Sequence, residues 1–281
     1  MSPKDYIFNS SQMPSLCVID SNNNEHIYGD IDDVYELASV TKLITANVVS
    51  NLVEDNFFNF DDVIDGIDYL KHQVRLIDLL SHTSGLSLNG EVPQIEPRQK
   101  RLYSNLAFET LNTFVVNKLE NEFGIRSINE LFNDGLKHVL TAKKNNYIDF
   151  YGAKASGARA NLGAIVALVQ EMRSPVFVSP QMQQKMRTIF LPELRGVLPG
   201  WGNYKHCAFG TGYEIKFDKS PHWMGTKSSP NTFGHFGQAG VFVLHDPDVN
   251  ISIVALGHKE IGTWSTDLWP KFVDEIFQNF I

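Results

Sequence analysis

The chain has 281 residues, of which 43% are hydrophobic and 20% are charged, and it carries a formal net charge of -8 at pH 7. This length and apolar content are sufficient for a substantial core and exclude a disordered chain. The acidic balance argues against nucleic acid or an anionic membrane as the main partner, because both would repel the protein.

The N-terminal residues 1–15 carry polar residues throughout their length and contain no apolar segment typical of a secretory signal. No apolar run in the chain is long enough to cross a bilayer. The two cysteines, Cys17 and Cys207, are interpreted as reduced thiols rather than as a disulfide. We therefore expect a cytoplasmic protein, although a removed export signal would leave the same pattern.

The first predicted elements are a β-hairpin and a helix. Two short apolar runs at 15–20 and 26–29 flank the polar turn at 21–25, a pattern typical of a hairpin. Apolar residues then recur at spacings of three and four, which predicts a helix with Ser39 at or near its first turn and an end at Asp55-Asn56. The apolar positions are Val40, Leu43, Ile44, Val48 and Leu52.

From Phe58 to about Leu194 the pattern is mostly helical, with loops rich in Gly, Pro and Asn. The expected helices are 75–80, 106–119, 128–140, 162–172 and 180–189. After Pro199-Gly200 the pattern changes to strands, which we expect at 208–217, 232–235, 240–245 and 251–257. The last segment carries an apolar stripe that must cover a sheet. Its members are Leu268, Trp269, Phe272, Val273, Ile276, Phe277 and Phe280.

These elements predict an α+β fold, in which an antiparallel sheet built from both chain ends is flanked by helices and an all-helical lobe is inserted between them. The predicted sheet lobe comprises residues 1–57 and 196–281, and the predicted helical lobe comprises residues 58–195. No internal repeat or low-complexity linker occurs.

Three short motifs carry the candidate chemistry. In Ser39-Val-Thr-Lys42, the two end residues share one helix face, so the lysine amine can reach the serine hydroxyl as a base. Tyr103-Ser-Asn105 and His235-Phe-Gly237 follow further along the chain. A lone Ser-x-x-Lys is more often a helix cap beside a surface lysine. All three motifs in this order, with the turn His82-Thr-Ser-Gly85 between them, favour a serine acyl-transfer enzyme.

These residues resemble those of the penicillin-recognising serine hydrolases, in the branch that contains class C β-lactamases, D-alanyl-D-alanine carboxypeptidases and related esterases. The resemblance covers nearly the whole chain and is carried by the segments 38–42, 79–86, 103–105 and 234–240. It implies the same architecture as the one inferred above, with the active site in the cleft between the two lobes. It also implies catalysis through a covalent acyl-serine.

Roles for the individual residues follow from this hypothesis. Ser39 is the expected nucleophile, and Lys42 and Tyr103 together form its base, because a lysine cation would lower the pKa of the phenol. Asn105 would orient Lys42 and the substrate. The resemblance implies that the strand with His235 and Gly237 binds the substrate, and that the amides of Ser39 and Gln238 form the oxyanion hole. No metal or cofactor is expected.

The third motif departs from the family pattern, which is usually Lys-Thr-Gly or Lys-Ser-Gly. That lysine and hydroxyl normally bind a substrate carboxylate, whereas Phe236 cannot form a hydrogen bond and His235 is charged only part of the time near neutrality. An uncharged ester or amide is therefore the expected substrate, with β-lactams and D-amino-acid peptides as further candidates. The partner is thus a small molecule, and the sequence gives no indication of oligomeric state.

Two other functions fit the same residues. An acyltransferase would form the same acyl-enzyme and pass the acyl group to an amine or alcohol, and a catalytically silent relative would only bind ligands. The absence of a Gly-x-Ser-x-Gly motif removes the usual α/β-hydrolase alternative. His82 is expected to be structural and Trp269 to lie in the core, whereas Trp223 fits the rim of the substrate cleft and the core equally well.

Overall fold

The computed structural model describes residues 13–90 and 94–280. Residues 1–12 lie outside the described residues. They make up most of the segment 1–15, in which the sequence predicts no secretory signal. The strands are β1 (Ser15–Ile19), β2 (Glu25–Gly29), β3 (Val34–Glu36), β4 (Arg101–Leu102), β5 (Ile148–Phe150), β6 (Ala158–Asn161), β7 (Gly196–Leu198), β8 (Gly202–Tyr204), β9 (Glu214–Ile215), β10 (Phe233–Gly237), β11 (Val241–Asp246) and β12 (Ile251–Leu256).

The helices begin with the short 3-10 helix η1 (Ala38–Val40), which leads directly into α2 (Thr41–Glu54). The others are α3 (Leu76–Leu80), α4 (Leu106–Phe123), α5 (Ile128–Asp134), α6 (Leu136–Leu140), α7 (Leu162–Arg173), α8 (Pro180–Met186) and α9 (Thr263–Phe280). No helix in the described ranges is long and apolar enough to span a bilayer.

A six-stranded antiparallel sheet in the order β2-β1-β12-β11-β10-β9 forms the centre of the protein. The N-terminal hairpin pairs along its full length, from Ser15 opposite Gly29 to Ile19 opposite Glu25. Strand β1 then pairs with β12 from the other end of the chain. The predicted α+β class, with a sheet made from both chain ends and flanked by helices, is therefore confirmed.

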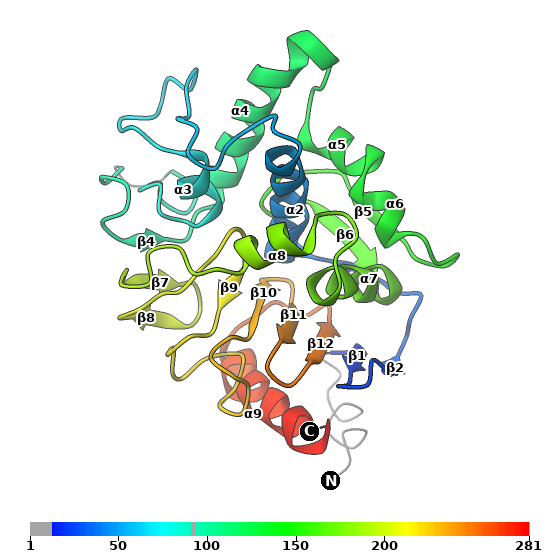
Figure 1. The fold of residues 1–281 in the computed structure, drawn as a ribbon. Helices are drawn as coiled ribbons and strands as arrows, with labels where there is room; N and C mark the ends of the chain where they lie inside the picture. The colour runs from blue at the N-terminus through cyan, green and yellow to red at the C-terminus, as the bar shows by residue number, and fades with distance from the viewer. Residues whose placement is uncertain (1–12, 91–93, 281) are drawn as a thin grey trace.

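The sheet is covered on both faces, and its strands β1, β10, β11 and β12 are buried at every position. On β11, Val241 and Val243 point into the core shared with α2 and α7, whereas Phe242 and Leu244 point into the core shared with α9. Figure 1 shows α9 on one side of β10, β11 and β12, and α2, α7 and α8 on the other. The predicted stripe of the last helix is thus buried, and Trp269 lies in the core with no exposed surface.

Several predicted elements differ in extent from those observed. The expected helix at 128–140 is two helices, α5 and α6, because Gly135 breaks it with φ −127° and ψ −94°. The helix that begins at Leu106 continues to Phe123 and ends at the left-handed Gly124. The expected strand at 208–217 is reduced to β9 and one isolated bridge between Phe209 and Glu214.

The inserted region is not all-helical, which corrects the prediction for residues 58–195. It contains β4, β5 and β6, which belong to two small sheets in the orders β3-β6-β5 and β4-β7-β8. These strands are only two to four residues long. So short a segment shows no alternation that sequence reading could detect. Both small sheets join the inserted region to chain segments that lie outside it or at its border.

Candidate active site

Ser39 lies in η1, immediately before the N-terminus of α2, and its side chain is partly exposed. The preceding Ala38 has a φ of 43°, a left-handed conformation that costs free energy for any residue with a side chain. The peptide N–H groups that open α2 point toward this turn and favour negative charge there. The predicted helix is therefore present, and Ser39 occupies the 3-10 turn that leads into it.

Lys42 is fully buried and its amine contacts three oxygen atoms. Its Nζ lies 3.1 Å from Ser39 Oγ, 2.8 Å from Asn105 Oδ1 and 3.0 Å from the carbonyl oxygen of Ala155. Burial lowers the pKa of Lys42 from 10.5 to about 7, and the negative charge of Glu109 opposes this effect. Close to half of the Lys42 side chains are consequently uncharged at neutral pH.

The three contacts fit a neutral amine that accepts a proton from the serine. A neutral amine has two N–H donors and one lone pair, and two of its neighbours, Asn105 Oδ1 and the carbonyl of Ala155, can only accept. The orientation of the Asn105 amide is fixed because its Nδ2 donates to Asn89 Oδ1 at 3.0 Å. With both N–H groups so occupied, the lone pair faces the Ser39 hydroxyl.

Tyr103 follows β4 and is held by the turn that contains His82. The backbone N–H of Leu102 donates to the His82 carbonyl at 3.0 Å, and that of Ser104 donates to His82 Nδ1 at 3.2 Å. The centroid of the tyrosine ring lies 4.5 Å from that of the His82 ring, with the two planes tilted by 35°, and the Lys42 amine lies 4.8 Å from the tyrosine centroid. His82 thus has the structural role expected from the sequence.

The protonation of Tyr103 differs from the sequence-based expectation. The prediction was that the Lys42 cation would lower the pKa of Tyr103 and make the phenolate a usable base. Burial instead raises the pKa of Tyr103 well above its ordinary value of 10, although a hydrogen bond with Ser39 opposes the shift. The phenol therefore stays protonated near neutrality, and Lys42 is the better base of the two.

His235 is fully buried behind Tyr103. Its Nδ1 donates to the carbonyl of Phe236 at 2.7 Å, which leaves Nε2 as an acceptor 3.4 Å from the Tyr103 hydroxyl. Burial, aided by the charge of Lys42, lowers the pKa of His235 to about 4. The imidazole is therefore neutral at physiological pH and contacts Tyr103, so it adds no positive charge to the site.

Gly237, the last residue of β10, lies against the nucleophile turn. A side-chain Cβ at this position would stand 2.3 Å from the Leu37 carbonyl oxygen and 3.2 Å from the Ala38 Cβ. Glycine is therefore the residue that lets β10 approach η1 this closely. This packing gives Gly237 a part in positioning the turn, and its expected part in binding or orienting the substrate stays a prediction.

The two amides expected to form the oxyanion hole come from this contact region. Gln238 follows β10, and its carbonyl accepts from the Ile261 N–H at 2.8 Å. The role of the Ser39 and Gln238 N–H groups as an oxyanion hole stays a prediction.

A buried group of charges that the sequence did not indicate lies behind β10. Glu214 on β9 is fully buried, with its Oε1 at 3.0 Å from Lys219 Nζ and 2.6 Å from His222 Nε2. Its Oε2 accepts from Trp223 Nε1 at 2.8 Å. Trp223 therefore belongs to the core and not to the rim of a cleft. The pairing of Glu214 with Lys219 leaves this region with no net charge.

Two further positioning elements were missed from the sequence. Ala155, whose carbonyl contacts Lys42, is held in place because its backbone N–H donates to Glu109 Oε1 at 3.2 Å. In the same loop, the carbonyl of Lys154 accepts a hydrogen bond from Thr45 Oγ1 at 2.7 Å. No motif in the sequence marks residues 154–155, because they act through their backbone.

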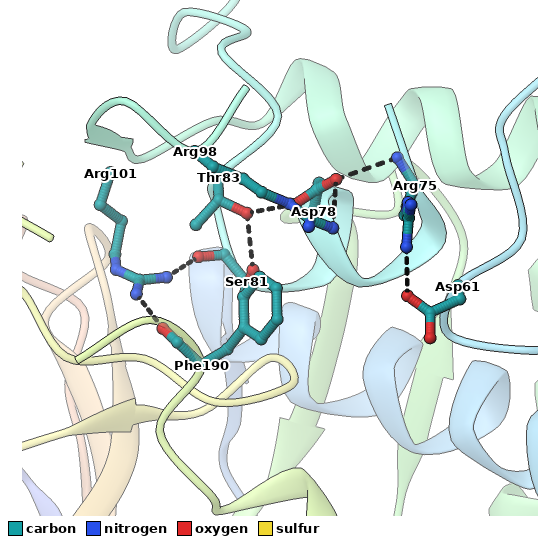
Figure 2. Close-up of polar contacts among 8 residues, drawn as sticks. All are labelled: Asp61, Arg75, Asp78, Ser81, Thr83, Arg98, Arg101 and Phe190. Carbon is teal, nitrogen blue, oxygen red and sulfur yellow. Dashed lines mark hydrogen bonds and ion pairs between the residues drawn. The ribbon is translucent and has the colours of Figure 1, made fainter. Parts of the chain in front are cut away.

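The second positioning element is the group of polar contacts around α3 in Figure 2. The buried Asp78 carboxylate accepts from Arg98 Nε and from Thr83 Oγ1, both at 2.8 Å. The buried Arg101 guanidinium donates to the carbonyls of Ser81 and Phe190. These contacts fix the turn on both sides of His82, and through it the position of Tyr103.

The fold and the Ser-x-x-Lys turn against the end of a sheet strand define the β-lactamase/transpeptidase-like class of proteins. The chain belongs to the β-lactamase family, whose model matches residues 9–276. It is similar to a β-lactamase from Mycobacterium bovis, with 29% identity, coverage of 99% of both chains and a TM-score of 0.88. A search of the curated proteins found no match.

More distant solved structures share the fold. A penicillin-binding protein from Bacillus halodurans has 14% identity and a TM-score of 0.71, over 95% of this chain and 97% of the other. EstCE1, described as a hydrolase with promiscuous acyltransferase activity, has 14% identity and a TM-score of 0.73, over 98% and 96% of the two chains.

Proposed function

We propose that this protein is a metal-independent serine hydrolase that cleaves an uncharged ester or amide through an acyl-enzyme on Ser39. The observation that carries the proposal is the environment of Lys42. Its amine is buried, has its pKa lowered to about 7, and lies 3.1 Å from the Ser39 hydroxyl. A structural lysine would not need to be desolvated beside a serine, whereas a general base works best with a pKa near the operating pH.

The mechanism begins when Ser39 Oγ attacks the substrate carbonyl carbon and its proton passes to the Lys42 amine. The amides of Ser39 and Gln238 stabilise the resulting oxyanion, and each such donor contributes about 3 kcal/mol to the transition state. When the intermediate collapses, the Tyr103 hydroxyl gives a proton to the leaving group and regains one from the Lys42 ammonium. Water then attacks the acyl-enzyme with Lys42 again acting as base, which releases the acid.

The preference for an uncharged substrate rests on the electrostatics of the site. His235 is neutral, and Phe236 replaces the hydroxyl that would bind a carboxylate. The Phe236 ring packs between aromatic side chains, at 6.3 Å from Trp201 and 5.7 Å from Trp223. Phe236 is thus a buried core residue, and because His235 is neutral, neither side chain offers a positive charge or a hydroxyl to a substrate carboxylate.

The residues of the site come from two parts of the chain. Ser39, Lys42 and His235 belong to the proposed sheet lobe of residues 1–57 and 196–281, whereas Tyr103 and Asn105 belong to the proposed lobe of residues 58–195. We propose that the substrate binds in a cleft between them. A cytoplasmic location is proposed with this function, and the buried unpaired thiols of Cys17 and Cys207 support it.

Acyl transfer is the second candidate, because water and an acceptor alcohol or amine would compete for the same acyl-enzyme. The acyltransferase activity named for EstCE1, which has this fold, favours keeping it. Product analysis with and without an added alcohol separates the two functions. If the protein were a silent binding relative, neither the wild type nor Lys42→Ala would turn over the substrate.

The test is the mass of the intact protein after treatment with a fluorophosphonate, for the wild type and for Ser39→Ala. We expect one adduct on the wild type and none on the variant. The substrate preference is tested by comparing hydrolysis of a short-chain aryl ester with that of benzylpenicillin at equal concentration. No adduct on the folded wild type contradicts the hydrolase, and faster cleavage of the penicillin contradicts the preference for uncharged substrates.

A further inference from the structure

Three cationic residues lie side by side at one end of the small sheet β4-β7-β8. Arg101 on β4 pairs with Gly196 on β7, and Gly196 pairs with Tyr204 on β8. Each of these three paired residues has a cationic neighbour at the same end of the sheet. Lys100 precedes Arg101, Arg195 precedes Gly196, and Lys205 follows Tyr204. The backbone continues the pairing there, because the Arg101 N–H donates to the Arg195 carbonyl at 2.9 Å. The three cations therefore occupy neighbouring positions on three adjacent chain segments.

The same three side chains line a cavity of about 400 Å³, which is within the size range of small-molecule sites. Gly196, Asn203 and Tyr204 complete its lining, so no carboxylate contributes to the wall. In the described part of the chain, none of the three cations forms an ion pair or a side-chain hydrogen bond.

This arrangement is unfavourable when the cavity holds only water. Like charges at neighbouring positions across strands destabilise a sheet, and here three of them are adjacent without an acidic partner. An anion between them would remove the repulsion. The guanidinium of Arg195 can bind two oxygens of one phosphate, and the two ammonium groups each add a charge-assisted hydrogen bond.

We propose that the cavity lined by Lys100, Arg195 and Lys205 binds a small polyanion of the phosphate or sulfate type. The Tyr204 side chain forms a wall rather than a donor, because its hydroxyl already donates to the Pro221 carbonyl at 2.7 Å. The Asn203 amide is exposed and supplies a neutral donor at the edge. The site shares no residue with the proposed catalytic group and does not depend on the proposed function.

Pyrophosphate, inorganic phosphate and sulfate serve as probes, each titrated by calorimetry into the whole protein at constant ionic strength kept with sodium chloride. We expect saturable binding that is strongest for pyrophosphate, and affinity at least about tenfold lower in Arg195→Gln and in Lys205→Gln, because each loses a charge-assisted contact. Lys227→Gln, at an exposed position outside the cavity, is the matched control and should bind as the wild type does.

Thermal unfolding gives a second readout. Without polyanion, the double variant Arg195→Gln/Lys205→Gln should unfold at the same temperature as the wild type or higher, because repulsion is removed. Pyrophosphate should raise the midpoint of the wild type and not that of the double variant. Equal effects of pyrophosphate on both proteins, or no effect beyond that of chloride on the wild type, would overturn the proposal. A larger effect of inorganic phosphate than of sulfate, a tetrahedral anion of similar size, supports a phosphoryl group as the ligand.

Discussion

The pH dependence of Ser39 acylation tests the assignment of Lys42 as the base. Because the pKa of Lys42 is lowered from 10.5 to about 7, roughly half of the amine is unprotonated at pH 7. A lysine with its ordinary pKa would be unprotonated in only about 0.03% of molecules at that pH. The second-order rate of fluorophosphonate labelling should therefore rise about tenfold per pH unit up to pH 7 and level off above it.

Two substitutions should move this profile in opposite directions. The charge of Glu109 raises the pKa of Lys42, so Glu109→Gln should shift the rise to lower pH. Glutamine can still accept the Ala155 N–H, which keeps the loop in place. Asn105→Asp places a negative charge at the atom 2.8 Å from the Lys42 amine and should shift the rise to higher pH.

The assay is the intact mass of each protein, sampled over time between pH 5 and pH 9 in buffers of equal ionic strength. The fluorophosphonate is stable enough to be corrected for its own hydrolysis with a protein-free control. A profile that still rises steeply between pH 8 and pH 9, or one that neither substitution moves, would refute the reasoning, because the proton would then be taken by a group other than Lys42.

Three further predictions concern single positions. Tyr103→Phe should lower the rate of ester turnover about 10²- to 10⁴-fold while the rise near pH 7 stays in place, because the phenol is the proton donor and not the base; loss of the rise would reassign the base to Tyr103. Gly237→Ala brings a Cβ to 2.3 Å from the Leu37 carbonyl oxygen and should displace η1, which lowers the rate of Ser39 acylation about 100-fold. Gly262→Ala is the control, because the atom nearest to its added Cβ lies 3.9 Å away. Burial lowers the pKa of His245 from 6.5 to about 4. Between pH 6.5 and pH 4 the unfolded chain therefore binds more protons at this residue than the folded protein does. The free energy of unfolding should consequently fall as the pH is lowered from 6.5 to 4. Urea unfolding should show that His245→Gln loses less stability than the wild type over this range, by about 3 kcal/mol, and equal losses would contradict a neutral buried imidazole.

The sequence was sufficient for those features that depend on spacing along the chain. The period of three and four after Ser39 predicted a helix, and the fixed geometry of a helix brings the amine of Lys42 to the Ser39 hydroxyl whatever surrounds them. Mostly apolar runs predicted strands β1, β11 and β12, which are buried at every position, because a strand buried on both faces has few polar positions. The stripe on the last helix likewise predicted that α9 covers the sheet.

Only the tertiary structure decided which groups carry protons, because a pKa depends on burial and on neighbours that are remote in sequence. Lys42 has a lowered pKa because it is fully buried, among groups that include Ala155, more than a hundred residues away in the chain. The neighbouring Lys42 predicts an acidic Tyr103, but burial raises the pKa of the phenol well above its ordinary value. The cations Arg195 and Lys205 were equally unremarkable in the sequence, and strand pairing alone brings them together.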